Sequence, residues 1–192
     1  RDLFAKQKSA KVQGLKPKHF SFNVDGGRCD ECKGDGVITV SMQFMADIEL
    51  ECEHCHGTRF KKEILEIKYD EKNISDILHM TVDEALEFFK ENHEEKIATK
   101  LKPLQDVGLG YLQLGQSSST LSGGEAQRVK LASFLVKGVT TEKTLFVFDE
   151  PSTGLHFHDI KKLLKSLQAL IELGHSVVVI EHQPDIIKSA DY

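Results

Sequence analysis

The segment TLFVFDEPSTG, residues 144–154, joins a short apolar run to two adjacent carboxylates. An apolar run of this length is typical of a strand that is buried on both faces of a parallel sheet. Asp149 and Glu150 follow at the carboxyl end of this strand, where α/β folds place their ligands. Pro151 and Gly154 then turn the chain. The segment therefore predicts an α/β fold with a ligand site at one strand end.

A helix and a second strand are predicted to follow. Apolar residues recur at helical spacing over residues 160–171, and Gly174 fits the end of that helix. Residues 176–180 predict a second buried strand, which is followed closely by His182. In a parallel pair of strands, His182 would lie at the same edge as the two carboxylates. A lone histidine at a strand end is usually structural, but this one is placed to reach the same ligand.

The two carboxylates suit phosphoryl transfer. An aspartate at such a strand end can anchor Mg²⁺, and an adjacent acid can orient the attacking water. Asp149 and Glu150 are therefore candidate catalytic residues, and His182 is a third.

The run LSGGEAQR, residues 121–128, predicts a helix with an accessible N-terminus. Ser122 and Glu125 have the spacing of a capping box. Gly123 and Gly124 leave the helix end bare, so backbone N–H groups and the positive end of the dipole can approach an anion. Ser-Gly-Gly alone favours a simple glycine-started helix. The strand-end carboxylates that follow favour an anion-binding role.

The middle of the chain predicts scaffold helices. Thr81 and Glu84 form a second capping box ahead of a buried face. A further helix is expected around residues 97–104, with Pro103 near its end. No chemistry is indicated here.

The four cysteines of the chain stand in two Cys-x-x-Cys pairs, namely Cys29, Cys32, Cys52 and Cys55. Two such turns can complete a tetrahedral shell of four sulfurs, which suits a structural zinc ion. Between the pairs, apolar residues alternate at 38, 40, 42 and 44, break at Ala46-Asp47 and resume at 48 and 50. This pattern predicts a β-hairpin with a zinc knuckle at each base.

Other uses of four cysteines remain open. Disulfides need a secreted setting, which nothing in the sequence indicates. A redox Cys-x-x-Cys explains one pair but not two matched pairs with flanking glycines. An iron–sulfur cluster is also compatible with four thiolates. The Cys-x-x-Cys-x-Gly-x-Gly half-repeat resembles the zinc modules of DnaJ-type chaperones. This likeness is limited to the first Cys-x-x-Cys pair and the partial repeat of its pattern at the second pair.

Basic residues gather around the predicted hairpin although the net charge is −5. From Leu3 to Val24 there are five lysines and no acid, which is a local patch able to meet phosphate. The candidate DNA-contacting residues are Lys16, Lys18, His19, Arg28, Lys33, Arg59, Lys61 and Lys62. A lysine-rich helix face that only meets solvent is one competing interpretation, and charge alone favours it. The other is a zinc hairpin with a purely structural role, whose lysines face solvent.

The overall composition, 40% apolar, is that of a soluble globular protein, and no apolar run is long enough to cross a membrane. The N-terminus has no apolar signal region, so a cytoplasmic location is expected.

Several segments resemble a known family. LSGGEAQRV resembles the signature of ABC-type ATPases, LFVFDE their Walker B strand, PSTGLH their D-loop and VVVIEH their switch-histidine strand. More narrowly, FSFNVDGGRCDECKGDGV and DVGLGYLQLGQSSSTLSGGEAQRVKLAS are similar to the C-terminal half of the UvrA family, which belongs to the bacterial UvrABC excinuclease. The likeness covers nearly the whole chain. Common ABC transporters lack a zinc hairpin before the signature, so the match is specific.

The resemblance implies a partial ABC-ATPase domain, with a P-loop NTPase type sheet and a helical signature region, carrying an inserted four-cysteine zinc β-hairpin. It implies a role in bacterial nucleotide excision repair, in which such proteins form homodimers, hydrolyse ATP at composite sites, sense damaged double-stranded DNA and load UvrB. Asp149 would coordinate Mg²⁺, Glu150 would be the catalytic acid and His182 the γ-phosphate sensor. The residues expected to contact ATP on a partner domain are Ser122, Gly123, Gly124 and Glu125, and the zinc ligands are Cys29, Cys32, Cys52 and Cys55.

One departure from the family concerns the phosphate loop. No Gly-x-x-x-x-Gly-Lys-Ser/Thr occurs, and in the family this loop lies upstream of the zinc insertion. We therefore interpret the sequence as a fragment that is inactive alone but belongs to an ATPase. Three segments are expected: 1–70, the basic arm and zinc hairpin; 71–120, the helical signature region; and 121–192, the signature helix, Walker B, D-loop and switch histidine.

Two alternatives are weighed against a repair ATPase. The first is a zinc-stapled DNA-binding or protein-interaction module with a degenerate ABC domain, which a Walker A sequence upstream in the parent gene would rule out. The second, a DnaJ-like client-binding protein, leaves Asp149, Glu150 and His182 without a role.

Overall fold

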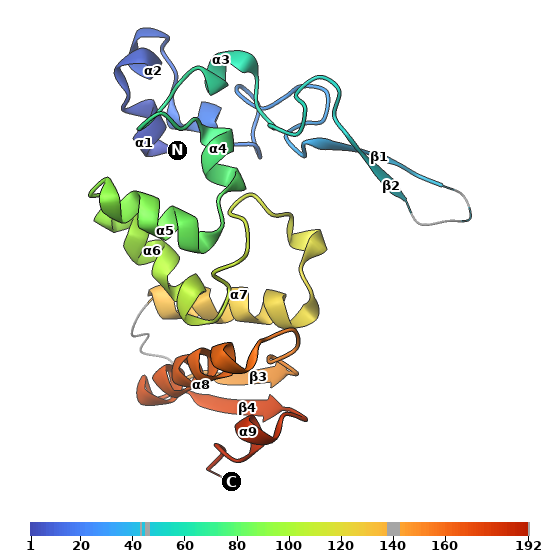
Figure 1. Cartoon of the computed structure of the whole chain (residues 1–192), viewed down its shortest axis with the longest axis vertical. Helices are drawn as coiled ribbons and strands as arrows, with labels where there is room; N and C mark the ends of the chain where they lie inside the picture. Colours follow the sequence, from blue (N-terminus) through green and yellow to red (C-terminus); the bar gives the residue numbers. More distant parts are fainter. Residues whose placement is uncertain (43, 45–46, 138–142, 192) are drawn as a thin grey trace. The chain divides into compact units, whose positions relative to one another are not determined.

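The computed structural model describes residues 1–42, 44, 47–137 and 143–191 (Figure 1). The chain divides into two compact units, Arg1–His79 and Met80–Tyr192, each treated separately below. The first holds α1 (Asp2–Ala5), α2 (Lys8–Val12), η1 (Pro17–Phe20), β1 (Val37–Val40), β2 (Ile48–Glu51), α3 (Lys62–Leu65) and α4 (Ile74–His79). The second holds α5 (Val82–Glu91), α6 (Glu95–Asp106), η2 (Ser118–Thr120), α7 (Gly123–Lys137), β3 (Leu145–Asp149), α8 (Phe157–Glu172), β4 (Ser176–Ile180) and α9 (Pro184–Ile187).

Strands β1 and β2 form the predicted antiparallel hairpin (Figure 1). Ile38 pairs with Leu50 and Val40 with Ile48, so these four aliphatic residues share one face of the ribbon. All four are exposed, by 39% to 54%. The predicted break at Ala46-Asp47 falls partly outside the described residues. A two-stranded ribbon with so little burial has no core of its own, so its stability depends on the residues at its base.

Strands β3 and β4 are parallel and joined by α8 (Figure 1). Their register places Leu145 opposite Ser176 and Asp149 opposite Ile180. The main core of this unit lies between α7, α8 and one face of the sheet, and includes Leu131, Ala132, Phe146, Phe148, Leu163, Leu167 and Leu170. The parallel register brings the carboxyl ends of both strands to one edge, as the β-α-β pattern predicts.

The prediction that both strands are buried on both faces is wrong for the described residues. In β3 only Phe146 and Phe148 are buried, while Leu145 and Val147 are 63% and 60% exposed. In β4, Val178 and Ile180 are about half exposed, at 47% and 51%. The physical reason is that α7 and α8 pack against one face only, and no described residue buries the other.

Helix α8 ends as its sequence predicts. Gly174 adopts φ +87° directly after the helix, a conformation that glycine adopts readily. The amide of His175 donates to the carbonyl of Leu170 at 3.1 Å, which completes a Schellman-type end.

Helices α5 and α6 pack against each other in the second unit. The predicted capping box is present: the Glu84 amide donates to Thr81 Oγ1 at 3.2 Å, and the Thr81 amide donates to Glu84 Oε2 at 2.8 Å. Pro103 lies inside α6, close to its end.

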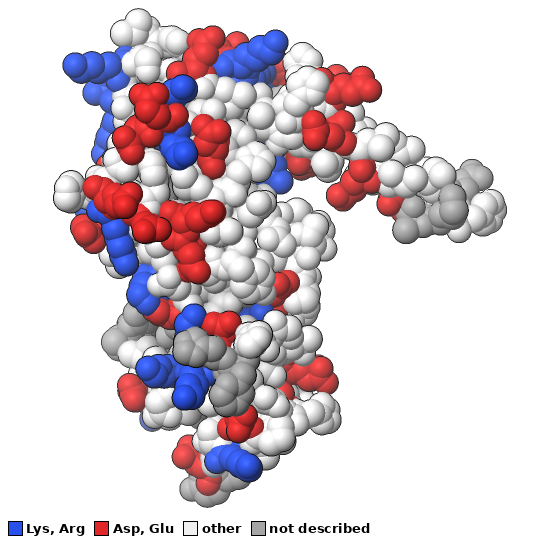
Figure 2. Space-filling view, viewed as in Figure 1, with Lys and Arg blue, Asp and Glu red and all other residues white. Residues whose placement is uncertain are grey.

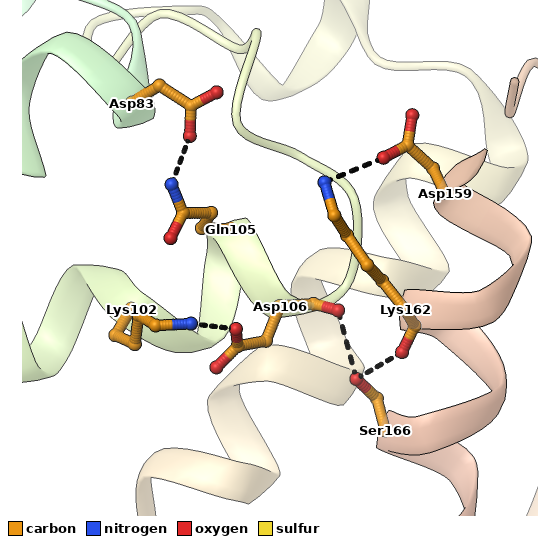
Figure 3. A network of polar contacts seen from close by, with 7 residues as sticks. All are labelled: Asp83, Lys102, Gln105, Asp106, Asp159, Lys162 and Ser166. Carbon is orange, nitrogen blue, oxygen red and sulfur yellow. Dashed lines mark hydrogen bonds and ion pairs between the residues drawn. The ribbon is translucent and has the colours of Figure 1, made fainter.

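Polar contacts join α5, α6 and α8 (Figure 3). Gln105 donates to Asp83 at 2.7 Å, and the Ser166 hydroxyl donates to the carbonyls of Asp106 and Lys162 at 3.2 and 3.0 Å. Since Ser166 is buried, these bonds satisfy a hydroxyl that would otherwise be costly to bury. The contacts from Ser166 thus hold the end of α6 against α8.

No described helix has both the length and the apolar character needed to cross a bilayer.

Candidate functional site

The four cysteines lie together at the base of the hairpin. All four are buried, and their sulfurs lie within 4.8 Å of one another. Cys29 Sγ is 4.0 Å from Cys52 Sγ, and Cys32 Sγ is 3.6 Å from Cys55 Sγ. A tetrahedral shell with zinc–sulfur bonds of ~2.3 Å has sulfur–sulfur edges of about 3.8 Å. The spacing of the sulfurs therefore fits a four-thiolate zinc site.

The two Cys-x-x-Cys turns have the same backbone shape. After the second cysteine of each pair, a residue and then a glycine take positive φ: Lys33 and Gly34 at +52° and +93°, His56 and Gly57 at +47° and +72°. A Cβ on Gly34 would come within 2.1 Å of the Phe22 carbonyl, so only glycine fits there. In the first turn the Gly36 amide donates to Cys32 Sγ at 3.3 Å. This repeated turn explains why glycines follow each pair.

The thiols affect one another's protonation. Backbone N–H groups of Cys55 and His54 lower the pKa of the Cys52 thiol to about 7, whereas desolvation raises the pKa of the Cys55 thiol to about 12. The pKa values of these two thiols are therefore shifted in opposite directions. A bound dication would hold all four as thiolates, which is the usual coupling of metal binding to proton release.

The candidate DNA-contacting residues surround this cluster, but several are already engaged. Arg28 donates to Asp25 at 2.9 Å and to the Lys33 carbonyl at 2.8 Å, and Lys61 pairs with Asp30 at 2.7 Å. Arg59 lies over the ring of Phe22, 5.2 Å from its centroid. These three cations therefore have a structural role.

The remaining candidates divide into one structural residue and four exposed lysines. His19 is half-buried; its Nδ1 accepts from the Lys16 amide at 2.9 Å, and its ring fills the space beside Gly26. The exposed lysines are Lys16, Lys18, Lys33 and Lys62.

The ribbon itself is acidic. Residues 34–58 contain Asp35, Asp47, Glu49, Glu51 and Glu53 and no Lys or Arg. Figure 2 shows acidic patches along the hairpin. Since DNA phosphates repel carboxylates, any phosphate contact in this unit belongs to the lysines outside the ribbon.

The strand-end residues come together in the second unit. Asp149 is the last residue of β3, and the Glu150 amide extends the strand ladder by donating to the Ile180 carbonyl at 2.9 Å. His182 Nε2 lies 3.7 Å from Glu150 Oε1, and both side chains are exposed. The structure thus brings these acids and the histidine to one edge of the sheet.

Glu150 has an unusual backbone. Its φ is +47°, in the left-handed region that few non-glycine residues adopt. Such strain persists only where the surroundings enforce it, and it is often found at functional sites. Here it turns the chain sharply out of β3.

The signature helix begins as predicted. The Ser122 amide donates to Glu125 Oε2 at 2.8 Å, and the Glu125 amide donates to Ser122 Oγ at 3.3 Å. Tyr111 adds a hydrogen bond to Glu125 Oε1 at 2.5 Å, and this bond and the Ser122 N–H hold the pKa of Glu125 below its usual value. A Cβ on Gly123 would meet nothing within 4 Å, so this residue is open to a ligand. The expectation that Gly124 is also bare is wrong, because Gly124 is buried and a Cβ on it would lie 3.2 Å from the Thr153 carbonyl oxygen and 3.3 Å from that of Glu150.

Two residues that the sequence analysis passed over attach this helix to the strand end. The side-chain amide of Gln127 donates to the backbone carbonyl of Asp149 at 2.8 Å and accepts from the backbone N–H of Asp149 at 3.0 Å. A neighbouring strand would make the same two bonds. Arg128 is fully buried and donates from Nη1 to the carbonyls of Pro151 and Thr153 at 2.6 and 3.2 Å. The sequence signal for these two residues was their position within the LSGGEAQR motif.

Comparison with known families decides the assignment. The family described as ABC transporter matches residues 39–153, more than half of the chain. The chain belongs to the ABC transporter family. The matched region runs from the hairpin through the signature helix to the turn after β3; it includes Cys52, Cys55, Asp149 and Glu150, whereas Cys29, Cys32 and His182 lie outside it.

Relatives that align with the whole of this chain are proteins of the same kind in several bacteria. It is 56% identical over all 192 residues to UvrABC system protein A of Clostridium perfringens and of Bacillus subtilis, and 55% identical to that of Streptococcus pneumoniae. The chain spans about one fifth of their length (20%). The likeness to the UvrA family predicted from the motifs is confirmed.

A solved structure agrees. The crystal structure of UvrA2 from Deinococcus radiodurans matches with a TM-score of 0.87 and 44% identity, over 98% of this chain and 23% of that one. The ABC-ATPase type of fold is therefore shown by structure as well as by sequence.

Proposed function

We propose that this chain is part of the DNA-damage-sensing ATPase of a UvrABC nucleotide excision repair system. The observation that carries the proposal is the meeting of Asp149, Glu150 and His182 at one sheet edge, beside a glycine-started helix. Likeness to UvrABC system protein A over the whole of this chain supplies the repair context. The chain retains Asp149, Glu150 and His182, which argues against the alternative of a module with a degenerate ABC domain.

In this proposal each residue has one task. Asp149 coordinates Mg²⁺, Glu150 orients the attacking water and His182 contacts the γ-phosphate of ATP. The open N-terminus of α7, with Ser122 and the amides of Gly123 and Gly124, contacts ATP held by a partner domain. ATP then binds at composite sites of a homodimer.

The metal has a structural role. Cys29, Cys32, Cys52 and Cys55 hold one zinc ion with no ligand position left open for chemistry. The ion fixes the base of the β1–β2 hairpin. The exposed lysines of the first unit contact the backbone of damaged double-stranded DNA, and UvrB is the protein partner.

The test is ATP hydrolysis by the full-length protein. Glu150→Gln should leave ATP binding within about threefold and lower kcat by about a hundredfold or more, because it removes the group that orients water. Glu172→Gln, at the exposed end of α8, is the matched control and should be neutral. Hydrolysis by the Glu150 variant at the unmodified rate would overturn the proposal.

A further inference from the structure

Glu181, the residue after β4, makes an unusual set of hydrogen bonds. Its Oε1 accepts from the Ser152 amide at 2.9 Å. Its Oε2 accepts from the amides of His182 and Gln183 at 3.1 and 3.3 Å. One carboxylate therefore joins the turn that follows β3 to the turn that follows β4.

The chain sequence explains why a side chain is needed here. The ladder between β3 and β4 ends where the Glu150 amide donates to the Ile180 carbonyl. Glu150 then takes φ +47° and Pro151 follows, so the chain leaves the strand and the backbone ladder does not continue. The Ser152 amide is the next donor, and the Glu181 side chain supplies the acceptor that a longer strand would have supplied.

The two joined turns carry the two facing reactive groups. Glu150 begins the first turn and His182 lies in the second, with Glu150 Oε1 and His182 Nε2 3.7 Å apart. These residues, with Glu181 and Ser152, line an open cavity of about 390 Å³. Glu181 is half-buried at its wall, whereas Glu150 and His182 are exposed.

The charge of Glu181 suits this role. Partial burial acts to raise its pKa, but the hydroxyl and N–H groups of Ser152, together with the N–H groups of Gln183 and His182, outweigh burial and hold the pKa below its usual value. The carboxylate is thus ionised at neutral pH, and an ionised carboxylate accepts N–H bonds more strongly than a neutral group does.

We propose that Glu181 is a positioning residue that sets the separation of Glu150 and His182 by tying the two turns together. It acts through the positions of Glu150 and His182. The inference rests on the proposed function, since it assigns Glu181 a task in the same reaction. A glutamine in its place keeps the length but turns an NH₂ group toward backbone N–H donors, so it can serve only one of the two turns.

Kinetics of the full-length protein test this. Glu181→Gln should lower kcat by about tenfold or more while the KM for ATP stays within about threefold, because misplacing reacting groups costs rate more than binding. Glu150→Gln is measured beside it, and Glu172→Gln is the control. Slow turnover in both site variants with a neutral control supports the role.

The outcomes separate the two proposals. If Glu150→Gln is slow and Glu181→Gln matches the unmodified protein, the positioning role is wrong and the proposed function stands. If Glu150→Gln turns over normally, the proposed function fails, and the role of Glu181 in it fails as well.

A measurement on the unmodified chain guards against a variant that does not fold. Amide exchange of Ser152 should be slowed, although this residue lies in a turn, because its N–H is bonded to Glu181. In Glu181→Gln this protection should fall while that of Val178 in β4 persists. Fast exchange at Ser152 in the unmodified chain would overturn the inference.

Discussion

At the scale of single residues, the strand-end site depends on side chains that take the place of backbone. The side chain of Gln127 pairs with the backbone N–H and carbonyl of Asp149, and the side chain of Arg128 donates to two backbone carbonyls of the following turn. Each is a polar side chain from α7 that satisfies main-chain groups where the sheet ends. The position of Asp149 is therefore set by α7 as well as by β4.

Gln127→Glu tests this attachment. The variant keeps the size of the side chain but sets a carboxylate oxygen against the Asp149 carbonyl, which should lower the free energy of unfolding by about 1 kcal/mol or more. Urea unfolding of this chain measures it. Gln168→Glu, on the exposed part of α8, adds the same charge and should have little effect. Equal effects of the two changes would contradict the prediction.

At the scale of elements, helix starts and the hairpin base hold the local structure. The N-terminus of α5 is closed by Thr81 and Glu84, and the backbone N–H of Thr81 together with its hydroxyl holds the pKa of Glu84 below its usual value. The β1–β2 ribbon has exposed faces and depends on its four sulfurs. These two elements respond to pH and to metal, respectively.

The capping box predicts a pH dependence. Because the folded state lowers the pKa of Glu84, its contribution is present above the unfolded value of 4.5 and is lost as pH falls through the folded value. Glu84→Gln should therefore destabilise the chain at pH 7 more than at pH 3. Thermal unfolding at both pH values measures this, with Glu87→Gln on the exposed side of α5 as control. A loss that is the same at both pH values would refute the prediction.

The cysteine cluster predicts one zinc ion per chain. Metal analysis of the purified protein should find it, and Cys52→Ser or chelation should remove it. Amide exchange should then rise around Cys29 and Cys55 and in β1–β2, while Phe148 and Val178 stay protected, because the second unit has its own core. Iron in place of zinc, or four free thiols without metal, would contradict the assignment.

At the scale of the whole molecule, charge is divided within the first unit. The ribbon over residues 34–58 is acidic, whereas the flanking segments hold the exposed lysines. A net charge of −5 therefore conceals a basic segment over residues 3–24, and any binding to nucleic acid must be local.

Replacing Lys16, Lys18, Lys33 and Lys62 by Ala in the full-length protein tests the DNA face. Affinity should fall for every DNA sequence, and the slope of log K against log salt should shrink by about 0.9 per lost phosphate contact. The matched control replaces four exposed lysines on helices of the second unit by Ala, namely Lys90, Lys96, Lys100 and Lys161. An unchanged slope in a variant that retains zinc would contradict DNA contact by these lysines and would leave the hairpin with a structural role only.

The sequence by itself determined the features that depend on neighbours along the chain. Spacing alone gave the paired knuckles at Cys29 and Cys52, the capping boxes at Thr81 and Ser122 and the β-α-β order around Asp149. Local hydrogen bonds and periodicity specify such elements, because their partners lie within a few residues. The family likeness followed from the same short motifs.

Only the tertiary structure decided what depends on distant partners. The apolar run of β3 gave no sign that Leu145 and Val147 would be exposed, because burial depends on which elements pack against a face. The bonds of Gln127 to Asp149 and of Glu181 to Ser152 join residues 22 and 29 positions apart. Sequence spacing cannot reveal such pairs, since they exist only after the helix and strands have packed.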